Sequence, residues 1–266
     1  MYPFRYYKAH SLEDAVAQLG QEGAKLIAGG HSLLPAMKQR LAMHELLVDI
    51  SQIQELQGIR VEAERLVIGA GVRHVQVASS QLVRETIPAL AELAGSIGDP
   101  LVRNKGTLGG SISNNDPAAD YPAALLGLAA KVVTTKGEHA ADEFFIGMFE
   151  TSLAEIEIVR EVSFAVPESA AYSRFANPAS RYVMAGAFIA RHKEGVRVAI
   201  SGAGATAFRA QAFEAALNAS FQTASVSGIA VDPTDMMSDM HGPAEYRAQL
   251  VKVMVQRAVK ELEAQD

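Results

Sequence analysis

Two pairs of adjacent glycines, each followed by side chains that donate hydrogen bonds, are the features of this sequence most able to hold a ligand. Gly29 and Gly30 end a short apolar run and are followed by His31 and Ser32. Glycines at the exit of a strand let the backbone take positive φ and approach a ligand closely. Successive N–H groups in such a turn form a nest for an anion, to which a serine hydroxyl adds a donor. The alternative is a tight strand-to-helix turn that binds nothing.

The second pair, Gly109 and Gly110, lies in a segment rich in hydroxyl and amide groups, running from residue 104 to residue 120. The polar side chains around the pair belong to Thr107, Ser111, Ser113, Asn114, Asn115, Asp116 and Asp120. Two such segments in one chain suit a ligand that has both a pyrophosphate and a polyol. Asp116 followed by Pro117 also has the pattern of a helix N-cap, so capping and ligand contact both stay open for this carboxylate.

These motifs together resemble a known family. The stretch Ala28–Gly29–Gly30–His31–Ser32–Leu33, the stretch Thr107–Leu108–Gly109–Gly110, and Asp116–Pro117 with Asp120 resemble the flavin subunit of the molybdenum hydroxylases. The likeness is to the medium subunit of carbon monoxide dehydrogenase and, more distantly, to the flavin domain of xanthine dehydrogenase. It extends from Tyr2 to about Ala258. The wider group is the p-cresol methylhydroxylase or vanillyl-alcohol oxidase type of FAD domain.

The resemblance implies an FAD held between two subdomains, with the redox chemistry on the flavin and no catalytic side chain on this chain. Main-chain N–H groups of both glycine segments would hold the pyrophosphate, and Asp120, which we favour over Asp116, would bind the ribityl chain. The expected contacts are Ala28, Gly29, Gly30, His31, Ser32, Leu33, Ile97, Thr107, Gly109, Gly110, Ser111, Asn114, Asp116, Asp120, Ile158 and Tyr182. Plain packing in the protein is the alternative for Ile97 and Tyr182, and it is the stronger reading for Ile158.

Composition limits the classes of function. The formal net charge is −6, which argues against a nucleic-acid partner because no basic stripe is left to neutralise phosphates. No apolar run approaches the length of a transmembrane segment and no secretory signal is visible, so a cytoplasmic protein is expected. The chain has no cysteine, so any iron–sulfur cluster must lie on another subunit. Its seven histidines are scattered without ligand spacing, so we predict no metal site.

The pattern of elements predicts an α+β protein with three units. Residues 1–55 form one FAD-binding subdomain, with a helix over 12–19 that begins with a capping box at Ser11, and strands near 26–28 and 46–50. Residues 56–168 form the second subdomain. Residues 169–266 form a C-terminal α+β domain with antiparallel strands joined by a hairpin turn at 194–195, and a final helix over 244–264. The run Gly202–Ala203–Gly204 mimics a dinucleotide fingerprint, but no strand ending in an acidic residue follows it, so we interpret it as a turn.

The resemblance also implies a role and partners. The chain would be the FAD-binding electron-transfer subunit of a heteromeric molybdenum hydroxylase, taking electrons from iron–sulfur clusters and passing them to an external acceptor. The molybdenum cofactor would lie in a large subunit and the [2Fe-2S] clusters in a small subunit, in a dimer of heterotrimers. A stand-alone flavin oxidase of the vanillyl-alcohol oxidase type is one alternative, although this chain looks too short to enclose a substrate as well. A non-redox scaffold that kept the fold is the other.

Overall fold

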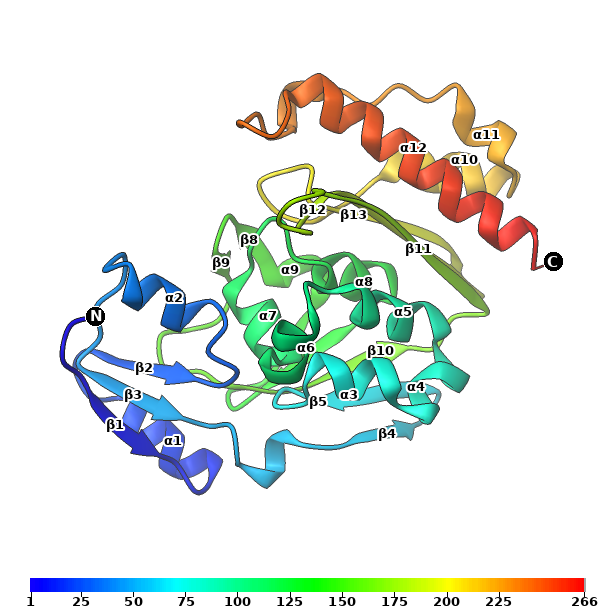
Figure 1. Ribbon diagram of the computed structural model, residues 1–266. Coiled ribbons are helices and arrows are strands. Elements are labelled where there is room, and N and C mark those ends of the chain that lie inside the picture. The colour runs from blue at the N-terminus through cyan, green and yellow to red at the C-terminus, as the bar shows by residue number, and fades with distance from the viewer. Residues whose placement is uncertain (266) are drawn as a thin grey trace.

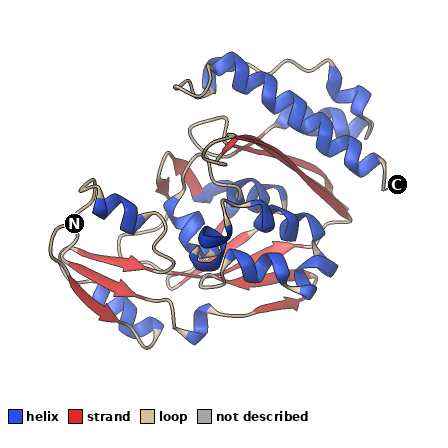
Figure 2. Cartoon of the chain, in the orientation of Figure 1, coloured by secondary structure: helices blue, strands red, loops and turns tan. Residues whose placement is uncertain are grey.

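The computed structural model describes residues 1–265, which build three main β-sheets with helices packed around them (Figures 1 and 2). The strands of the three sheets lie within residues 5–49, 59–165 and 169–209, respectively. Each set of strands therefore falls inside one of the three predicted units. We call the units the first subdomain, the second subdomain and the C-terminal domain. The α+β class expected from the sequence is confirmed.

The first subdomain is a small parallel sheet with the strand order β1–β3–β2. Its elements are β1 (Arg5–Lys8), α1 (Leu12–Leu19), β2 (Ala24–Ile27), α2 (Leu33–Lys38) and β3 (Leu46–Asp49). The predicted start of the first helix is confirmed, because the hydroxyl of Ser11 accepts a hydrogen bond from the N–H of Asp14 at 3.1 Å. The first glycine pair lies in the connection from β2 to α2.

The second subdomain is built on an antiparallel sheet of order β4–β5–β10–β6–β7, in which β10 lies between strands that precede it by many residues. The strands are β4 (Ile59–Glu62), β5 (Arg65–Gly69), β6 (Lys131–Thr134), β7 (Glu138–Ala140) and β10 (Val159–Ala165), with a separate hairpin of β8 (Phe145–Gly147) and β9 (Glu150–Thr151). The helical elements are η1 (Gln54–Leu56), α3 (His74–Ser79), α4 (Gln81–Thr86), α5 (Pro88–Ser96), α6 (Pro100–Lys105), α7 (Leu108–Asn114), α8 (Tyr121–Gly127) and α9 (Ala141–Phe144). The second glycine pair lies in the first turn of α7.

The C-terminal domain has an antiparallel sheet of order β11–β12–β13–β14. Its strands are β11 (Ser169–Ala176), β12 (Val183–His192), β13 (Gly195–Ser201) and β14 (Phe208–Arg209), and its helices are α10 (Gln211–Ala219), α11 (Thr223–Ser227), η2 (Pro233–Asp235) and α12 (Ala244–Glu263). A hairpin turn joins β12 and β13 as predicted, but its two loop residues are 193–194, one position earlier than expected; Gly195, with φ +135°, is the first residue of β13. Gly202 has φ +81° and leads toward the short edge strand β14, so the reading of this run as a turn is confirmed.

Two hydrophobic cores hold these units together. The larger core joins both FAD-type subdomains, and it also takes in Phe188 and Ala190 of β12 from the C-terminal domain. The smaller core packs α12, α10 and α11 against one face of the C-terminal sheet, where Val198, Met254 and Val255 are at most 1% exposed. The other face of that sheet lies on α8 and α5 of the second subdomain (Figure 1). The C-terminal domain is thus packed directly onto helices that border the predicted site.

Candidate functional site

The connection from β2 to α2 presents a row of unused backbone donors. Among residues 1–265, the N–H groups of Gly29, Gly30, His31, Ser32 and Leu33 donate to no protein acceptor. The next N–H, that of Leu34, returns to the carbonyl oxygen of Gly30 at 3.1 Å and starts the helix. His31 and Ser32 are exposed, while the residues on either side are half-buried. We call this row of five free N–H groups the nest, because successive free backbone donors can bind an anion.

The two glycine segments meet in space, as the sequence requires if they are to share a ligand. A Cβ placed on Gly29 would lie 2.1 Å from the carbonyl oxygen of Lys105 and 2.8 Å from the Cα of Gly106. These two residues directly precede Thr107 and α7. Gly29 is therefore needed because another stretch of protein backbone lies against it. Gly30 has a different requirement, since its φ is +72°.

The second segment does not offer its backbone donors as we expected. The N–H of Leu108 donates to the carbonyl oxygen of Val72 at 3.0 Å, and that of Gly109 to the carbonyl oxygen of Ala70 at 2.8 Å. The N–H of Gly110 donates to the hydroxyl of Thr107, which caps the helix. No larger residue fits in place of Gly109, because a Cβ at this position would lie 2.5 Å from the Cβ of Ala70.

Three residues of α7, Gly110, Ser111 and Asn114, could contact a ligand through exposed surface or side chains instead of backbone N–H groups. Gly110 is exposed, and a Cβ there would meet only the hydroxyl of Thr107, at 2.9 Å. Ser111 and Asn114 are half-buried. The second segment thus offers a bare surface at Gly110 together with polar side chains. Of the N–H groups of residues 107–111, that of Thr107 is the one that donates to no acceptor among the described residues, so the continuous row of free donors belongs to the first segment.

Asp116 and Asp120 have different surroundings. Asp116 is half-buried, and its carboxylate accepts a hydrogen bond from the N–H of Ala118 at 2.9 Å, which closes a turn. The expectation that Asp116 caps a helix is wrong, because the next helix, α8, begins only at Tyr121. Asp120 directly precedes α8 and is 6% exposed.

The Asp120 carboxylate is part of a buried ion pair. Its Oδ1 accepts from the hydroxyl of Tyr172 at 2.8 Å and from the guanidinium of Arg174 at 2.9 Å. Burial raises the pKa of this carboxyl, and the Arg174 guanidinium and the Tyr172 hydroxyl oppose that rise. Because both contacts fall on Oδ1, a ligand hydroxyl would have to bind at Oδ2.

The candidates Ile97, Ile158 and Tyr182 occupy three different environments. Ile97 follows the last turn of α5 and is half-buried. Ile158 is 1% exposed and belongs to the large core, in agreement with the stronger alternative. Tyr182, just before β12, is 59% exposed, so it is neither a core residue nor part of a strand. Partial burial raises the pKa of the Tyr182 phenol, and the Asp116 carboxylate raises it further.

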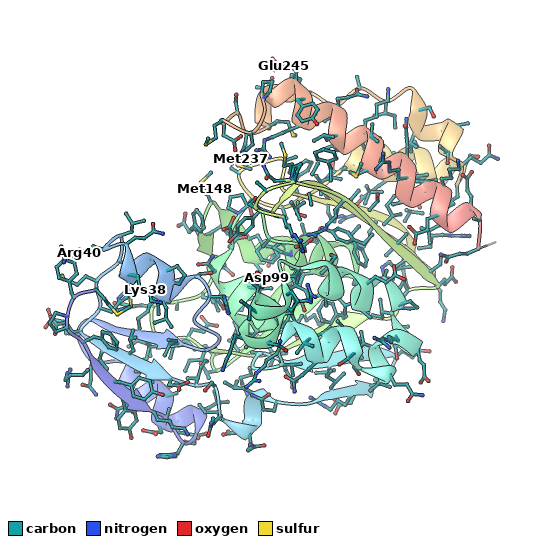
Figure 3. All side chains as sticks on the ribbon, viewed as in Figure 1. Lys38, Arg40, Asp99, Met148, Met237 and Glu245 are labelled. Atoms are coloured by element: carbon teal, nitrogen blue, oxygen red, sulfur yellow. The ribbon has the colours of Figure 1, made fainter. Side chains whose placement is uncertain are left out.

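All three units contribute charges around Asp99, the residue that caps α6. Hydrogen bonds from the N–H groups of Val102 and Leu101 lower the pKa of Asp99, and the positive groups of Arg181 and His31 lower it further. His31 belongs to the nest, and Arg181 belongs to the segment that carries Tyr182. In the view of Figure 3, Asp99 lies among the helices of the second subdomain, to the right of Lys38 of α2 and below Met237 of the C-terminal domain. Gly29 of the first subdomain lies against Lys105, the last residue of α6, so the nest adjoins the helix that Asp99 caps.

One buried histidine beside this region was not singled out from the sequence. His74 is 4% exposed, and a Cβ on Gly106 would lie 2.5 Å from its Nε2. Burial lowers the pKa of His74 to about 4, with smaller effects from His31 and Arg103. Its Nδ1 has no hydrogen-bond partner among the described residues, and neither does the hydroxyl of Tyr121, whose ring lies 5.4 Å away. A lone histidine in an apolar stretch gives no sequence signal for such a position.

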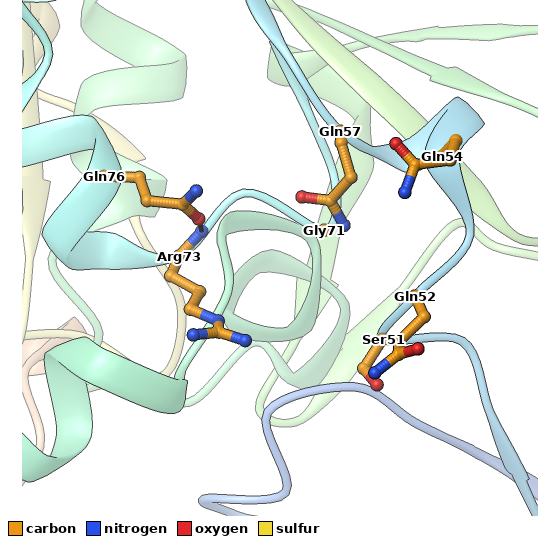
Figure 4. A pocket seen from close by; sticks show the side chains of 7 residues that line it. All are labelled: Ser51, Gln52, Gln54, Gln57, Gly71, Arg73 and Gln76. Atoms are coloured by element: carbon orange, nitrogen blue, oxygen red, sulfur yellow. Dashed lines mark hydrogen bonds between the residues drawn. The ribbon is translucent and has the colours of Figure 1, made fainter.

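A polar pocket of about 350 Å³ lies where the first and second subdomains join (Figure 4). Its lining residues are Ser51, Gln52, Gln54, Gln57, Gly71, Arg73 and Gln76, none of which was predicted as a ligand contact. The backbone of Arg73 pairs with that of Thr107, so the pocket adjoins the start of α7. These residues could not be recognised beforehand, because isolated glutamines form no recognisable motif.

Within residues 1–265, no helix is both long enough and apolar enough to span a membrane. No group of three or more histidine, aspartate or glutamate side chains is arranged to hold a metal ion within the same residues.

Comparison with known proteins gives consistent matches over nearly the whole chain. Residues 2–168 match the FAD binding domain in molybdopterin dehydrogenase, and residues 182–262 match the CO dehydrogenase flavoprotein C-terminal domain. The carbon monoxide dehydrogenase medium chain of Hydrogenophaga pseudoflava is 37% identical over 96% of each chain. The 6-hydroxypseudooxynicotine dehydrogenase complex subunit alpha of Paenarthrobacter nicotinovorans is 34% identical, over 96% of this chain and 93% of that one.

Solved structures agree with these matches. A chain of the Hydrogenophaga pseudoflava carbon monoxide dehydrogenase that lacks the Mo-pyranopterin moiety superposes with a TM-score of 0.88 at 36% identity, over 99% of both chains. A chain of quinoline 2-oxidoreductase from Pseudomonas putida 86 has a TM-score of 0.88 at 26% identity, over 98% of this chain and 96% of that one. The nest, the neighbouring glycine segment and these matches lead to one assignment. The chain belongs to the FAD-binding medium subunits of the molybdenum hydroxylases, the family of oxidoreductase subunits that includes the carbon monoxide dehydrogenase medium chain.

Proposed function

We propose that this chain binds one FAD across the seam between its first two subdomains and acts there as the electron-transfer subunit of a molybdenum hydroxylase. The observation that carries the proposal is the row of five unused N–H groups from Gly29 to Leu33, held against the start of α7. A pyrophosphate supplies several anionic oxygens for such a row, and charge-assisted hydrogen bonds to backbone N–H groups are among the stronger ones in proteins.

The remaining predicted contacts would orient the rest of the dinucleotide. Ser111, Asn114 and Asp120 are the groups for the ribityl hydroxyls, and the exposed Tyr182 ring is the group for one face of the flavin ring system. When bound, FAD supplies the ability to accept electrons one at a time and release them as a pair. The chain itself supplies binding, orientation and a fixed electrostatic environment, with no general base or nucleophile.

The partners follow from the family. We infer a large subunit that holds the molybdenum cofactor and a small subunit that holds [2Fe-2S] clusters, because this chain has no cysteine to ligate a cluster. Medium chains among its relatives belong to carbon monoxide and glyceraldehyde dehydrogenases. We propose a dimer of heterotrimers in the cytoplasm, with electrons entering from the iron–sulfur subunit and leaving to an external acceptor. We also propose unit boundaries near residues 55 and 168.

The test begins with the chain alone. Purified protein should contain or take up one FAD per chain, seen as flavin absorbance in the visible range and as a saturable change in FAD fluorescence. A chain that stays colourless and shows no saturable binding at 100 µM FAD (roughly the affinity of a weak ligand) would refute the proposal. Coexpression with the two partner subunits then tests electron transfer. The complex should reduce a dye acceptor with substrate, while the same complex stripped of FAD should lose reduction of acceptors that require the flavin.

A further inference from the structure

Arg174 of β11 joins three elements around the proposed flavin site. One nitrogen of its guanidinium contacts Oδ1 of Asp120 at 2.9 Å, and another donates to the carbonyl oxygen of Ser96 at 2.5 Å. Ser96 is the last residue of α5, and Asp120 directly precedes α8. The Arg174 side chain is 15% exposed and that of Asp120 is 7% exposed. A single cation of the C-terminal domain thus connects two helices of the second subdomain.

The contact of Arg174 with the carbonyl oxygen of Ser96 holds the turn after α5, which contains Ile97 and Gly98 and which we call the Ile97 corner. A second guanidinium, that of Arg103 in α6, donates to the carbonyl oxygen of Ile97 at 3.0 Å and lies 3.5 Å from that of Gly98. Gly98 has φ +45°, so the chain turns sharply after Ile97. Two arginines therefore satisfy the carbonyl groups that the end of α5 leaves unpaired. Ile97 is held from both sides of the corner.

We propose that Arg174 is a positioning residue for FAD, through which the C-terminal domain fixes both the Asp120 carboxylate and the Ile97 corner of the site. The inference rests on the proposed function and extends it, because it makes the flavin site dependent on a domain that the predicted contacts involve only through Tyr182. Arg174 itself need not touch the cofactor. Its planar guanidinium reaches two acceptors at once, which a lysine ammonium on a flexible stem does not reproduce.

A closely matched control, Arg197, contacts the C-terminal end of α8, whereas the Asp120 partner of Arg174 directly precedes that helix. Arg197 of β13 donates to the carbonyl oxygen of Leu126 in α8 at 2.7 Å and pairs with Asp142 at 2.6 Å. Its side chain is 17% exposed, close to the value for Arg174. Like Arg174 it links the C-terminal sheet to one carbonyl and one carboxylate of the second subdomain. None of its contacts is with a predicted flavin residue.

The experiment compares Arg174→Gln, Arg174→Lys and Arg197→Gln in the full chain. We would measure the Kd for FAD, the thermal midpoint, and the visible circular dichroism of FAD at saturation, which reports how the flavin is held. Arg174→Gln should weaken FAD binding about 10- to 100-fold, the size of effect that loss of a supporting partner has on a metal ligand. It should also alter the circular dichroism. Arg174→Lys should fall between Arg174→Gln and the wild type, and Arg197→Gln should lower the thermal midpoint with an unchanged Kd.

A double variant separates positioning from general destabilisation. If Arg174 acts through Asp120, the effects of Arg174→Gln and Asp120→Asn on FAD binding should be less than additive when combined. Full additivity, equal loss of FAD affinity in Arg174→Gln and Arg197→Gln, or wild-type binding in Arg174→Gln would each overturn the inference. Should Arg174→Gln fail to fold, the comparison of Arg174→Lys with Arg197→Lys decides by the same criteria. Failure of the wild-type chain to bind FAD would instead refute the proposed function.

Discussion

Replacing Gly29 by alanine tests whether the contact between the two glycine segments organises the site. The new Cβ would start 2.1 Å from the carbonyl oxygen of Lys105, whereas real Cβ contacts essentially never fall below 3.0 Å. Because the obstacle is backbone, the nest and the start of α7 must separate by about 1 Å, which typically costs 1–3 kcal/mol of stability. We expect the thermal midpoint to fall by roughly 2–4 °C for each kcal/mol lost in a chain of this size.

The effect of Gly29→Ala on FAD should be larger than its effect on stability. Moving the nest relative to the second segment should break at least two hydrogen bonds to the pyrophosphate, at about 1.5–3 kcal/mol each. The Kd for FAD should therefore rise more than about 100-fold. Fluorescence titration of the flavin-free protein measures this change. Gly95→Ala in α5 is the control, since its Cβ would meet only the Cβ of Ala78 at 3.7 Å. Unchanged FAD affinity in a folded Gly29→Ala protein would refute our account of the nest.

Three further predictions concern individual residues. Gly110→Ala should remain folded, with a thermal midpoint within about 3 °C of wild type, because the gain in helix propensity offsets a disturbed cap. It should nevertheless bind FAD more weakly in the same titration. Full affinity would show that no ligand approaches Gly110. Asp120→Asn should weaken FAD binding more than Asp116→Asn, and equal Kd values would remove the ribityl role from Asp120. Burial lowers the pKa of His74 to about 4 in the folded protein, whereas its pKa in the unfolded chain is near 6.5. As the pH falls, the unfolded chain therefore binds the proton first, and the free energy of unfolding should drop by about 2 kcal/mol between pH 8 and pH 5. Urea unfolding at several pH values should show that loss in the wild type and a flatter profile in His74→Gln, and parallel profiles would contradict it.

The sequence predicted the meeting of the two glycine segments better than it predicted the local structure of either one. Adjacent glycines with polar neighbours indicated both segments, and the structure brings them into contact. The helix α7 was not foreseen, because Gly109, Gly110, Ser111 and Ser113 all have poor helix propensity. Packing of Gly109 on Ala70 and capping by Thr107 override that preference. The free N–H groups could not be assigned from sequence either, since the acceptors of α7 lie on another segment, at Ala70 and Val72.

The contacts of the C-terminal domain were the least predictable part. The strand β11 was not foreseen, although it carries both partners of Asp120, Tyr172 and Arg174. Its residues alternate weakly, because both faces contact a hydrophobic core, with Ala170 and Tyr172 on the larger core and Ala171 and Phe175 on the smaller one. An arginine in such a strand looks like an ordinary surface charge. Only the three-dimensional arrangement reveals that it pairs with a residue 54 positions earlier.

Because β10 lies in the middle of its sheet, the sheet of the second subdomain cannot be completed during synthesis until β10 has left the ribosome. This strand, Val159–Ala165, pairs with β5 on one side and β6 on the other. Until it emerges, the nascent polypeptide exposes two unpaired strand edges, which invite association with other chains. Flavin loading therefore has to follow synthesis of about the first 165 residues, and premature termination before β10 should yield an aggregating fragment in place of a smaller flavoprotein.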